Sequence, residues 1–146
     1  MAILLEDRIK LQAQVASKED AIKACGQLLV DTGCVEAGYI DGMLAREESM
    51  STYLGNGVSI PHGQFDNRAQ IRSTGISVLQ IPEGIVWEDD EKAYLIIGIA
   101  AQEDEHVEVL SNLAEAIEDE DTIQALITTT DKQVILDYLG KQQQDA

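Results

Sequence analysis

The sequence predicts an α/β fold: a single domain in which a mixed β-sheet is flanked by helices. Three observations indicate this. A chain of 146 residues suits one domain with its own core. The run from Ala93 to Ala101 is continuously apolar, as expected of a central strand buried on both faces. Segments with helical apolar spacing lie on both sides of that run, and no linker or repeat divides residues 1–146.

The N-terminal third predicts one strand and two helices. Apolar and polar residues alternate from Ile9 to Val15, the period-two pattern of a half-buried strand. Ser17, with an acid three residues later, is a candidate N-cap for a helix that ends at Gly33. A second apolar helical stripe begins at Tyr39, and the charged run Arg46–Glu48 lies mostly off it.

The remainder predicts four more strands and three helices. Short strands are expected over Val58–Ile60, Gly75–Ile81 and Ile85–Trp87, the last two joined by a turn at Pro82–Gly84. After the central strand we expect a helix whose buried stripe is Val107, Leu110, Leu113, Ala114 and Ile117. Asp121 and Thr130 mark the starts of two further helices, and Lys141 to Ala146 form a polar tail.

The composition excludes several classes of partner. The net charge of −17, from 27 acidic against 10 basic residues, repels nucleic-acid phosphates and anionic lipids and favours a basic protein surface. No segment approaches the ~20 apolar residues of a membrane span, and no basic segment precedes the first apolar run. We therefore expect a cytoplasmic protein with no direct membrane insertion. Cys25 and Cys34 form no CxxC pair and are expected to be buried, reduced thiols.

His62 is the first candidate for a functional side chain. Pro61 before it has a fixed φ and favours an extended conformation at Ile60, so the short apolar strand should stop at His62. Glycines on both sides, Gly57 and Gly63 among them, allow positive φ and close approach of a partner. Imidazole is nucleophilic and titrates near neutral pH. A lone histidine after a strand is nevertheless more often a structural residue.

Two more residues could act with His62. His106 follows the central strand in the first turn of a helix, where the helix dipole favours a neutral imidazole. Arg46 lies at the end of a helix, where it could equally well only compensate the dipole. A nucleophilic imidazole with a second imidazole and a guanidinium around it suits reversible phosphoryl transfer.

The absence of several sequence motifs limits the reactions that this chain is expected to catalyse. The chain has no G-x-x-x-x-G-K-[ST] loop, kinase glycine loop or obvious carboxylate pair for magnesium, so another phosphorylated protein should be the donor. It also lacks H-E-x-x-H spacing and a G-x-S-x-G elbow. We expect no metal and no cofactor.

The stretch Tyr-Leu-Gly-Asn-Gly-Val-Ser-Ile-Pro-His-Gly, residues 53–63, resembles the phosphorylation site of the type-2 (fructose–mannitol class) EIIA proteins of the bacterial phosphoenolpyruvate-dependent sugar phosphotransferase system (PTS). The resemblance extends over residues 1–146 as one EIIA type-2 domain. It includes the segments at 43–47, 82–84 and 95–101, and is greatest to the mannitol-specific EIIA component.

This resemblance implies a phosphocarrier. His62 would accept a phosphoryl group from the phosphorylated carrier protein HPr and pass it to a cysteine of EIIB, for uptake of mannitol through the membrane component EIIC. His106 and Arg46 would stabilise the transferring group. Asn56 and Gly57 would support the site, although some relatives have an acidic residue where this chain has Asn56.

Two other hypotheses remain. A nitrogen-regulatory EIIA would share the histidine stretch but act as a phosphorylation-dependent binding module. A structural domain would not use either histidine.

Overall fold

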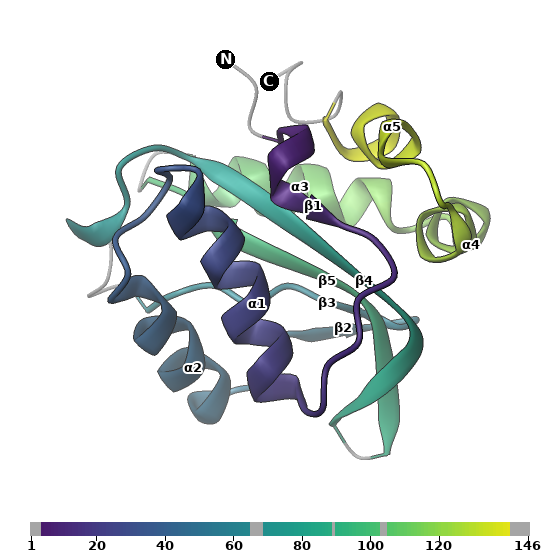
Figure 1. Ribbon diagram of the computed structural model, residues 1–146, viewed down its shortest axis with the longest axis horizontal. Helices are drawn as coiled ribbons and strands as arrows, with labels where there is room; N and C mark the ends of the chain where they lie inside the picture. Colours follow the sequence, from purple (N-terminus) through teal and green to yellow (C-terminus); the bar gives the residue numbers. More distant parts are fainter. Residues whose placement is uncertain (1–3, 65–68, 89, 103–104, 141–146) are drawn as a thin grey trace.

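The computed structural model describes residues 4–64, 69–88, 90–102 and 105–140. A central sheet has α1 and α2 on one face and α3, α4 and α5 on the other (Figure 1). This confirms the expected α/β class with a mixed sheet. The elements are η1 (a 3₁₀ turn, Glu6–Arg8), β1 (Ile9–Lys10), α1 (Lys18–Asp31), α2 (Tyr39–Ser49), β2 (Tyr53–Gly55), β3 (Val58–Ser59), β4 (Gly75–Glu88), β5 (Glu91–Ala100), α3 (His106–Ala116), α4 (Glu120–Thr128), α5 (Lys132–Ile135) and η3 (a π-helical turn, Leu136–Gly140).

The described strands form one sheet in the order β1-β4-β5-β3-β2. β1 is parallel to β4 and β3 is parallel to β5, whereas the β4–β5 and β3–β2 pairs are antiparallel. The long apolar strand β5 lies at the centre of the sheet, as the sequence predicts.

The core consists of two apolar clusters, one on each face of the sheet. Along β5 the side chains alternate between them. Ile96 and Ala100 belong to the cluster under α1 and α2, whereas Leu95, Ile97 and Ile99 belong to the cluster that includes side chains of α3, α4 and α5. All five are fully buried. The period of two therefore orients β5 between two helical layers.

The first strand is shorter than the sequence pattern predicts. β1 has two residues, Ile9 and Lys10, and pairs with Val78 and Leu79 of β4. Gln12 has a φ of 54°, which is incompatible with a continuous strand. Its amide hydrogen bonds to the side chain of Gln80, at 3.0 Å. The predicted strand to Val15 is wrong because this turn interrupts it.

The two strands expected over 75–81 and 85–87 are one strand, β4. Pro82 to Gly84 form a bulge instead of a turn. In the pairing with β5, β4 advances from Gln80 to Ile85 while β5 moves only from Leu95 to Ala93. Gly84 has a φ of 71°, and a proline without an N–H is tolerated at a bulge. The long partner strand keeps both halves in one sheet.

The helices begin close to the predicted caps. The Ser17 side chain accepts a hydrogen bond from the Asp20 amide, which confirms the start of α1. α4 and α5 are capped by Asp119 and Asp131, near the predicted starts at Asp121 and Thr130. No helix within the described residues is long and apolar enough to cross a membrane. The predicted tail at 141–146 lies outside the described residues.

The buried stripe of α3 differs from the prediction in part. Leu113 and Ile117 are buried as expected, and Val109 joins them, but Ala114 is exposed and Val107 is 74% exposed. The buried residues Val109, Leu113 and Ile117 are spaced by four, and Val107, two positions before Val109, lies on the opposite side of the helix and faces solvent. The cysteines follow the prediction: Cys25 and Cys34 are buried free thiols, and burial raises the pKa of Cys25 to about 12.

Candidate functional site around His62

His62 lies where the strand segment after β3 reaches the carboxyl end of β5. Val58 and Ser59 pair in parallel with Leu95 and Ile96. The same register continues to His62, which pairs with Ile99. The Ile99 amide donates to the carbonyl of Pro61 at 2.8 Å. β3 itself ends at Ser59, one residue before the expected end at Ile60, and the pairing with β5 resumes for one residue at His62. The histidine is half-buried at an edge of the sheet.

One ring nitrogen of His62 contacts the backbone two residues before it. Nδ1 lies 2.9 Å from the carbonyl oxygen of Ile60. A carbonyl oxygen can only accept, so Nδ1 carries the proton in this contact. In the neutral ring the lone pair then lies on Nε2. The Ile60 carbonyl thus makes Nε2 the ring nitrogen that could act as a nucleophile.

Gly63, the residue after His62, is needed for a reason that the sequence does not reveal. A Cβ at Gly63 would lie 2.5 Å from Cε1 and 2.8 Å from Cζ of the Tyr39 ring. The Gly63 amide donates to the Tyr39 hydroxyl at 2.9 Å. Gly55 and Gly57, in contrast, have the expected positive φ values of 97° and 82°. Close approach of an aromatic ring therefore accounts for Gly63.

Arg46 is half-buried in the last turn of α2. Its guanidinium donates to the carbonyl of Met50, the C-cap residue of the helix, where a positive charge also compensates the helix dipole. The chain after Met50 then approaches the histidine segment, since the Ile60 amide donates to the Thr52 carbonyl at 3.0 Å. Arg46 therefore belongs to the helix end from which the chain passes to Thr52, the backbone partner of Ile60.

Glu47, the neighbour of Arg46, is buried although the sequence pattern places it off the apolar stripe. It is 5% exposed. Its carboxylate accepts hydrogen bonds from the amide and hydroxyl of Thr52 and from Nε1 of Trp87. Lys18 Nζ lies 3.7 Å away. These donors explain how a carboxylate can be buried here.

His106 lies in the first turn of α3, as predicted, but its side chain lies outside what the structure describes. The loop before it is anchored to β4. Thr74 donates to the Glu105 carboxylate at 3.0 Å and accepts from the Gln102 amide at 3.1 Å. β5 ends at Ala100, one residue after the partner of His62. His62 thus pairs one residue before the end of β5, and the backbone of His106 follows that end by six positions.

Asn56 and Gly57 lie at the other end of the strand segment. Asn56, with a φ of 55°, and Gly57 form the turn between β2 and β3. Gly57 and His62 are five positions apart, which in extended backbone is a distance of about 16 Å. The structure does not bring these two residues together with His62; they shape the hairpin.

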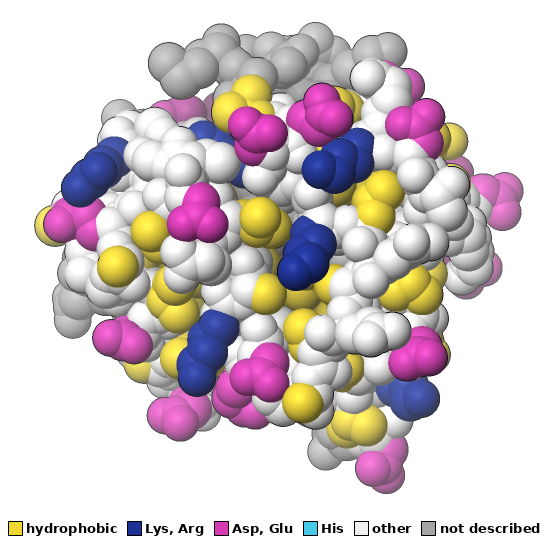
Figure 2. Space-filling model, in the orientation of Figure 1, with side chains coloured by type: hydrophobic (Ala, Val, Ile, Leu, Met, Phe, Trp, Pro, Cys, Tyr) yellow, Lys and Arg dark blue, Asp and Glu magenta, His cyan; other side chains and the backbone are white. Residues whose placement is uncertain are grey.

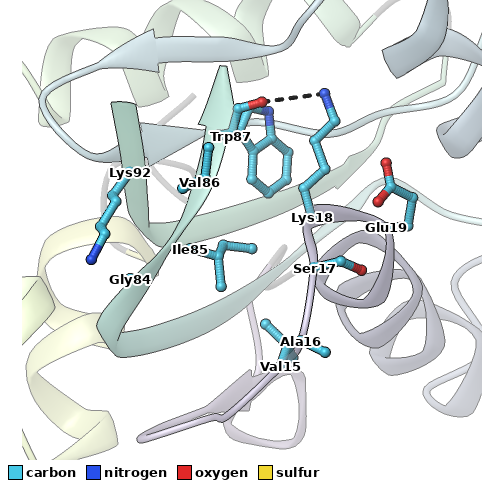
Figure 3. A pocket seen from close by; sticks show the side chains of 10 residues that line it. All are labelled: Val15, Ala16, Ser17, Lys18, Glu19, Gly84, Ile85, Val86, Trp87 and Lys92. Carbon is cyan, nitrogen blue, oxygen red and sulfur yellow. Dashed lines mark hydrogen bonds between the residues drawn. The ribbon is translucent and has the colours of Figure 1, made fainter. Parts of the chain in front are cut away.

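A pocket lies still farther from His62, where α1 begins beside β4 (Figure 3). Its lining includes Ser17, Gly84, Trp87 and Lys92, and Lys18 donates to the Trp87 carbonyl at 3.3 Å. Lys92 precedes Ile99 by seven residues of one strand, about 23 Å. This pocket is therefore separate from the edge that carries His62.

Comparison of the sequence with protein families identifies the family of this chain. The family model described as phosphoenolpyruvate-dependent sugar phosphotransferase system, EIIA 2, matches residues 2–142. The chain belongs to this family. The match covers the whole sheet, both helical layers and the His62 edge.

Three relatives show the range of the family. A mannitol-specific phosphotransferase enzyme IIA component of Bacillus subtilis is 40% identical over 93% of this chain and 95% of that protein. A multiphosphoryl transfer protein of Haemophilus influenzae is 47% identical over 90% of this chain, which spans only 26% of that protein. The complex of enzyme IIAMTL and phosphorylated enzyme IIBMTL from Escherichia coli contains a chain with 38% identity and a TM-score of 0.87; the match covers 92% of this chain and 95% of that one.

Sequence reasoning missed two residues of this site. Tyr39 contributes a hydroxyl that reaches Gly63, and Glu47 contributes a carboxylate that holds Thr52, the backbone partner of Ile60. The sequence pattern indicated one only as a member of an apolar stripe and the other as a surface charge. The spacing of Tyr39, Met43 and Glu47, four residues apart, is the one signal that could have placed all three on the buried face.

Proposed function

We propose that this EIIA domain is a phosphocarrier that takes a phosphoryl group from phospho-HPr on His62 and passes it to a cysteine of EIIB, for the uptake of mannitol. The observation that carries the proposal is the His62 ring, half-buried at the sheet edge with Nδ1 on the Ile60 carbonyl. The 40% identity to a mannitol-specific IIA component supports the choice of sugar alcohol.

The chemistry follows from the protonation of the ring. The Nε2 lone pair attacks the phosphorus of phospho-HPr while the phosphorus–nitrogen bond to the HPr histidine breaks, and that histidine takes back its electron pair. Forward transfer repeats the exchange with an EIIB thiolate as the nucleophile. The phosphoryl group moves between side chains, so the reaction needs neither nucleotide nor cofactor.

Arg46 and His106 are the proposed supporting residues. In transfer, charge is spread over the three equatorial phosphoryl oxygens, which a guanidinium and a second imidazole can hold. Arg46 would leave the Met50 carbonyl or use its remaining N–H groups, since a guanidinium has five donors. His106 begins the helix that follows the His62 edge.

The proposed setting is the cytoplasm. Upstream and downstream partners would be HPr and EIIB, with EIIC reached only through EIIB. The net charge of −17 favours basic protein surfaces and gives nucleic acid no role.

Intact mass tests the proposal. The protein is incubated with phosphoenolpyruvate, enzyme I and HPr, and His62→Gln serves as the control. We expect one acid-labile phosphoryl group on the wild type and none on the variant, with the same thermal unfolding for both. No gain of mass with active upstream proteins would refute the phosphocarrier function.

A second step identifies the acceptor. Phosphorylated protein is mixed with a mannitol EIIB, and loss of its phosphoryl group to EIIB supports the transport function. Acceptance from HPr without transfer to that EIIB would instead favour a nitrogen-regulatory binding module. If His62 gains no phosphoryl group in the first step and none reaches EIIB in the second, only the hypothesis of a structural domain remains.

A further inference from the structure

The hydroxyl of Tyr39 bridges the chain after His62 to the central strand. Tyr39 is the first residue of α2 and is 3% exposed. Its hydroxyl accepts the Gly63 N–H at 2.9 Å and donates to the Ile99 carbonyl at 3.0 Å. Burial raises the pKa of Tyr39 to about 12, so this hydroxyl keeps its donating proton at neutral pH.

The bridge occupies one position of the parallel ladder. Ile99 donates its N–H to Pro61, at 2.8 Å. In a regular parallel ladder the next bond would join the Gly63 N–H to the Ile99 carbonyl. The tyrosine hydroxyl lies between these two groups. The hydroxyl is therefore hydrogen-bonded to both of the groups that this ladder bond would join.

Gly63 and Tyr39 fit each other closely. The position of a Cβ at Gly63 falls 2.5 Å from the Tyr39 ring, which a real Cβ could not occupy. The ring and its hydroxyl thus fix both the location and the hydrogen bond of the residue after His62. On the other side of the histidine, the Ile60 carbonyl holds Nδ1. The two contacts therefore restrain the chain on both sides of the His62 ring.

A second tyrosine makes the same bridge at the far end of this segment. The Tyr53 hydroxyl accepts the Gly57 N–H at 3.1 Å and donates to the Lys92 carbonyl of β5 at 3.2 Å. Gly57 and Gly63 are thus each joined to β5 through a phenol. Because Tyr53 acts about 16 Å along the strand from His62, it provides a matched control.

We propose that Tyr39 is a positioning residue for phosphoryl transfer, whose hydroxyl sets the direction in which the His62 ring leaves the sheet. This inference rests on the proposed phosphocarrier function. Tyr39 itself does not touch the phosphoryl group; it acts through the Gly63 backbone. Since small misplacements of a nucleophile cost large factors in rate, loss of the bridge should slow transfer without weakening docking of the donor.

The test compares Tyr39→Phe with Tyr53→Phe. Each variant loses one hydroxyl and keeps its ring. Transfer from radiolabelled phospho-HPr is followed by rapid quench over a range of donor concentrations. For Tyr39→Phe we expect a maximal rate about tenfold lower, with KM for phospho-HPr within about twofold of wild type. Tyr53→Phe should change neither constant. Hydrogen exchange of the Gly63 amide should accelerate in Tyr39→Phe alone.

The outcomes separate the two proposals. A wild-type rate in Tyr39→Phe, or an equal loss in Tyr53→Phe, overturns the positioning function while the phosphocarrier function stands. A rise of KM alone also overturns it, because the hydroxyl would then act on docking. If the wild-type protein accepts no phosphoryl group, the phosphocarrier proposal fails and this inference fails with it. Thermal unfolding above the assay temperature confirms that each variant is folded.

Discussion

At the scale of single residues, His62 differs from an ordinary histidine after a strand because its surroundings restrain it on both sides. The Ile60 carbonyl holds Nδ1 and the Tyr39 hydroxyl holds the Gly63 amide. Pro61 is joined to β5 through the Ile99 amide. Such pre-organisation reduces the entropy that a nucleophile loses on reaching its reactive geometry.

Arg46→Lys tests whether the guanidinium does more than compensate the end of α2. Lysine keeps the positive charge near the Met50 carbonyl, so the free energy of unfolding should change by less than about 0.5 kcal/mol. A lysine cannot hold two phosphoryl oxygens with one planar group. We expect transfer from phospho-HPr to slow about tenfold, measured by rapid quench. Unchanged transfer would limit Arg46 to its structural function.

Ser59→Ala tests an unusual buried hydroxyl in β3. The Ser59 Oγ is fully buried and has no hydrogen-bond partner among the described residues. Burial of an unpartnered hydroxyl costs about 1–3 kcal/mol. The variant should therefore raise the free energy of unfolding by about 1 kcal/mol, measured by urea unfolding.

Ser77→Ala is the matched control for this prediction. Ser77 is equally buried, in β4, but its hydroxyl donates to the Cys25 carbonyl at 2.8 Å. Its loss should lower the free energy of unfolding by about 1 kcal/mol. If both variants destabilise the protein alike, the unpartnered state of Ser59 has no energetic consequence.

At the scale of helices and strands, the carboxylate of Glu47 links three elements of the fold. Glu47 on α2 accepts from Trp87 of β4 and lies near Lys18 of α1. It also fixes Thr52, whose carbonyl pairs with Ile60. The same carboxylate thus connects the helical layer to the strand that ends at His62.

Glu47→Gln should weaken this connection. Hydrogen bonds to a charged group contribute about 1.5–3 kcal/mol each. The side-chain NH₂ of a glutamine would face one of the N–H or O–H groups that now donate to the Glu47 carboxylate, so that bond would be lost. We expect a loss of about 2 kcal/mol in the free energy of unfolding, followed by Trp87 fluorescence in urea. Glu48→Gln, an exposed neighbour on the same helix, should change it by less than about 0.5 kcal/mol. Equal effects would show that only the net charge matters.

At the scale of the whole molecule, the dominant property is its charge. Acidic side chains are spread over the face that α1 and α2 form, with fewer basic side chains between them (Figure 2). A net charge of −17 produces a field that would attract a donor with a basic surface and would increase its association rate without tight binding. Rapid release suits a protein that must exchange partners.

Added salt should therefore slow phosphoryl acceptance. At limiting donor concentration, raising the ionic strength from about 0.01 M to about 0.5 M shortens the Debye length from about 30 Å to a few ångströms. We expect the second-order rate of transfer from phospho-HPr to fall about tenfold, and the rate at saturating donor to change little. A second-order rate that is independent of ionic strength would exclude electrostatic steering.

Most of the fold could be predicted from local patterns. Helical spacing, N-caps and the apolar run of β5 were sufficient for the α/β class and the central strand, and Pro61 indicated that the short strand stops before His62. The patterns failed where pairing partners compete with local signals. Pro82 to Gly84 resembles a turn, yet the length of β5 keeps β4 continuous through a bulge. Gln12 interrupts an alternating pattern because its amide binds Gln80, 68 positions away.

The sequence by itself determined the family, the layer architecture and the candidate nucleophile, because these depend on periodicity and on a short motif contained in neighbouring residues. Only the tertiary structure determined what restrains that nucleophile. Tyr39 reaches Ile99 across 60 positions and Glu47 reaches Trp87 across 40. The spacing of residues along a chain encodes which face a side chain occupies. The partner of a single hydroxyl or carboxylate depends instead on how the helical layer settles on the sheet, which is fixed only when the whole core packs.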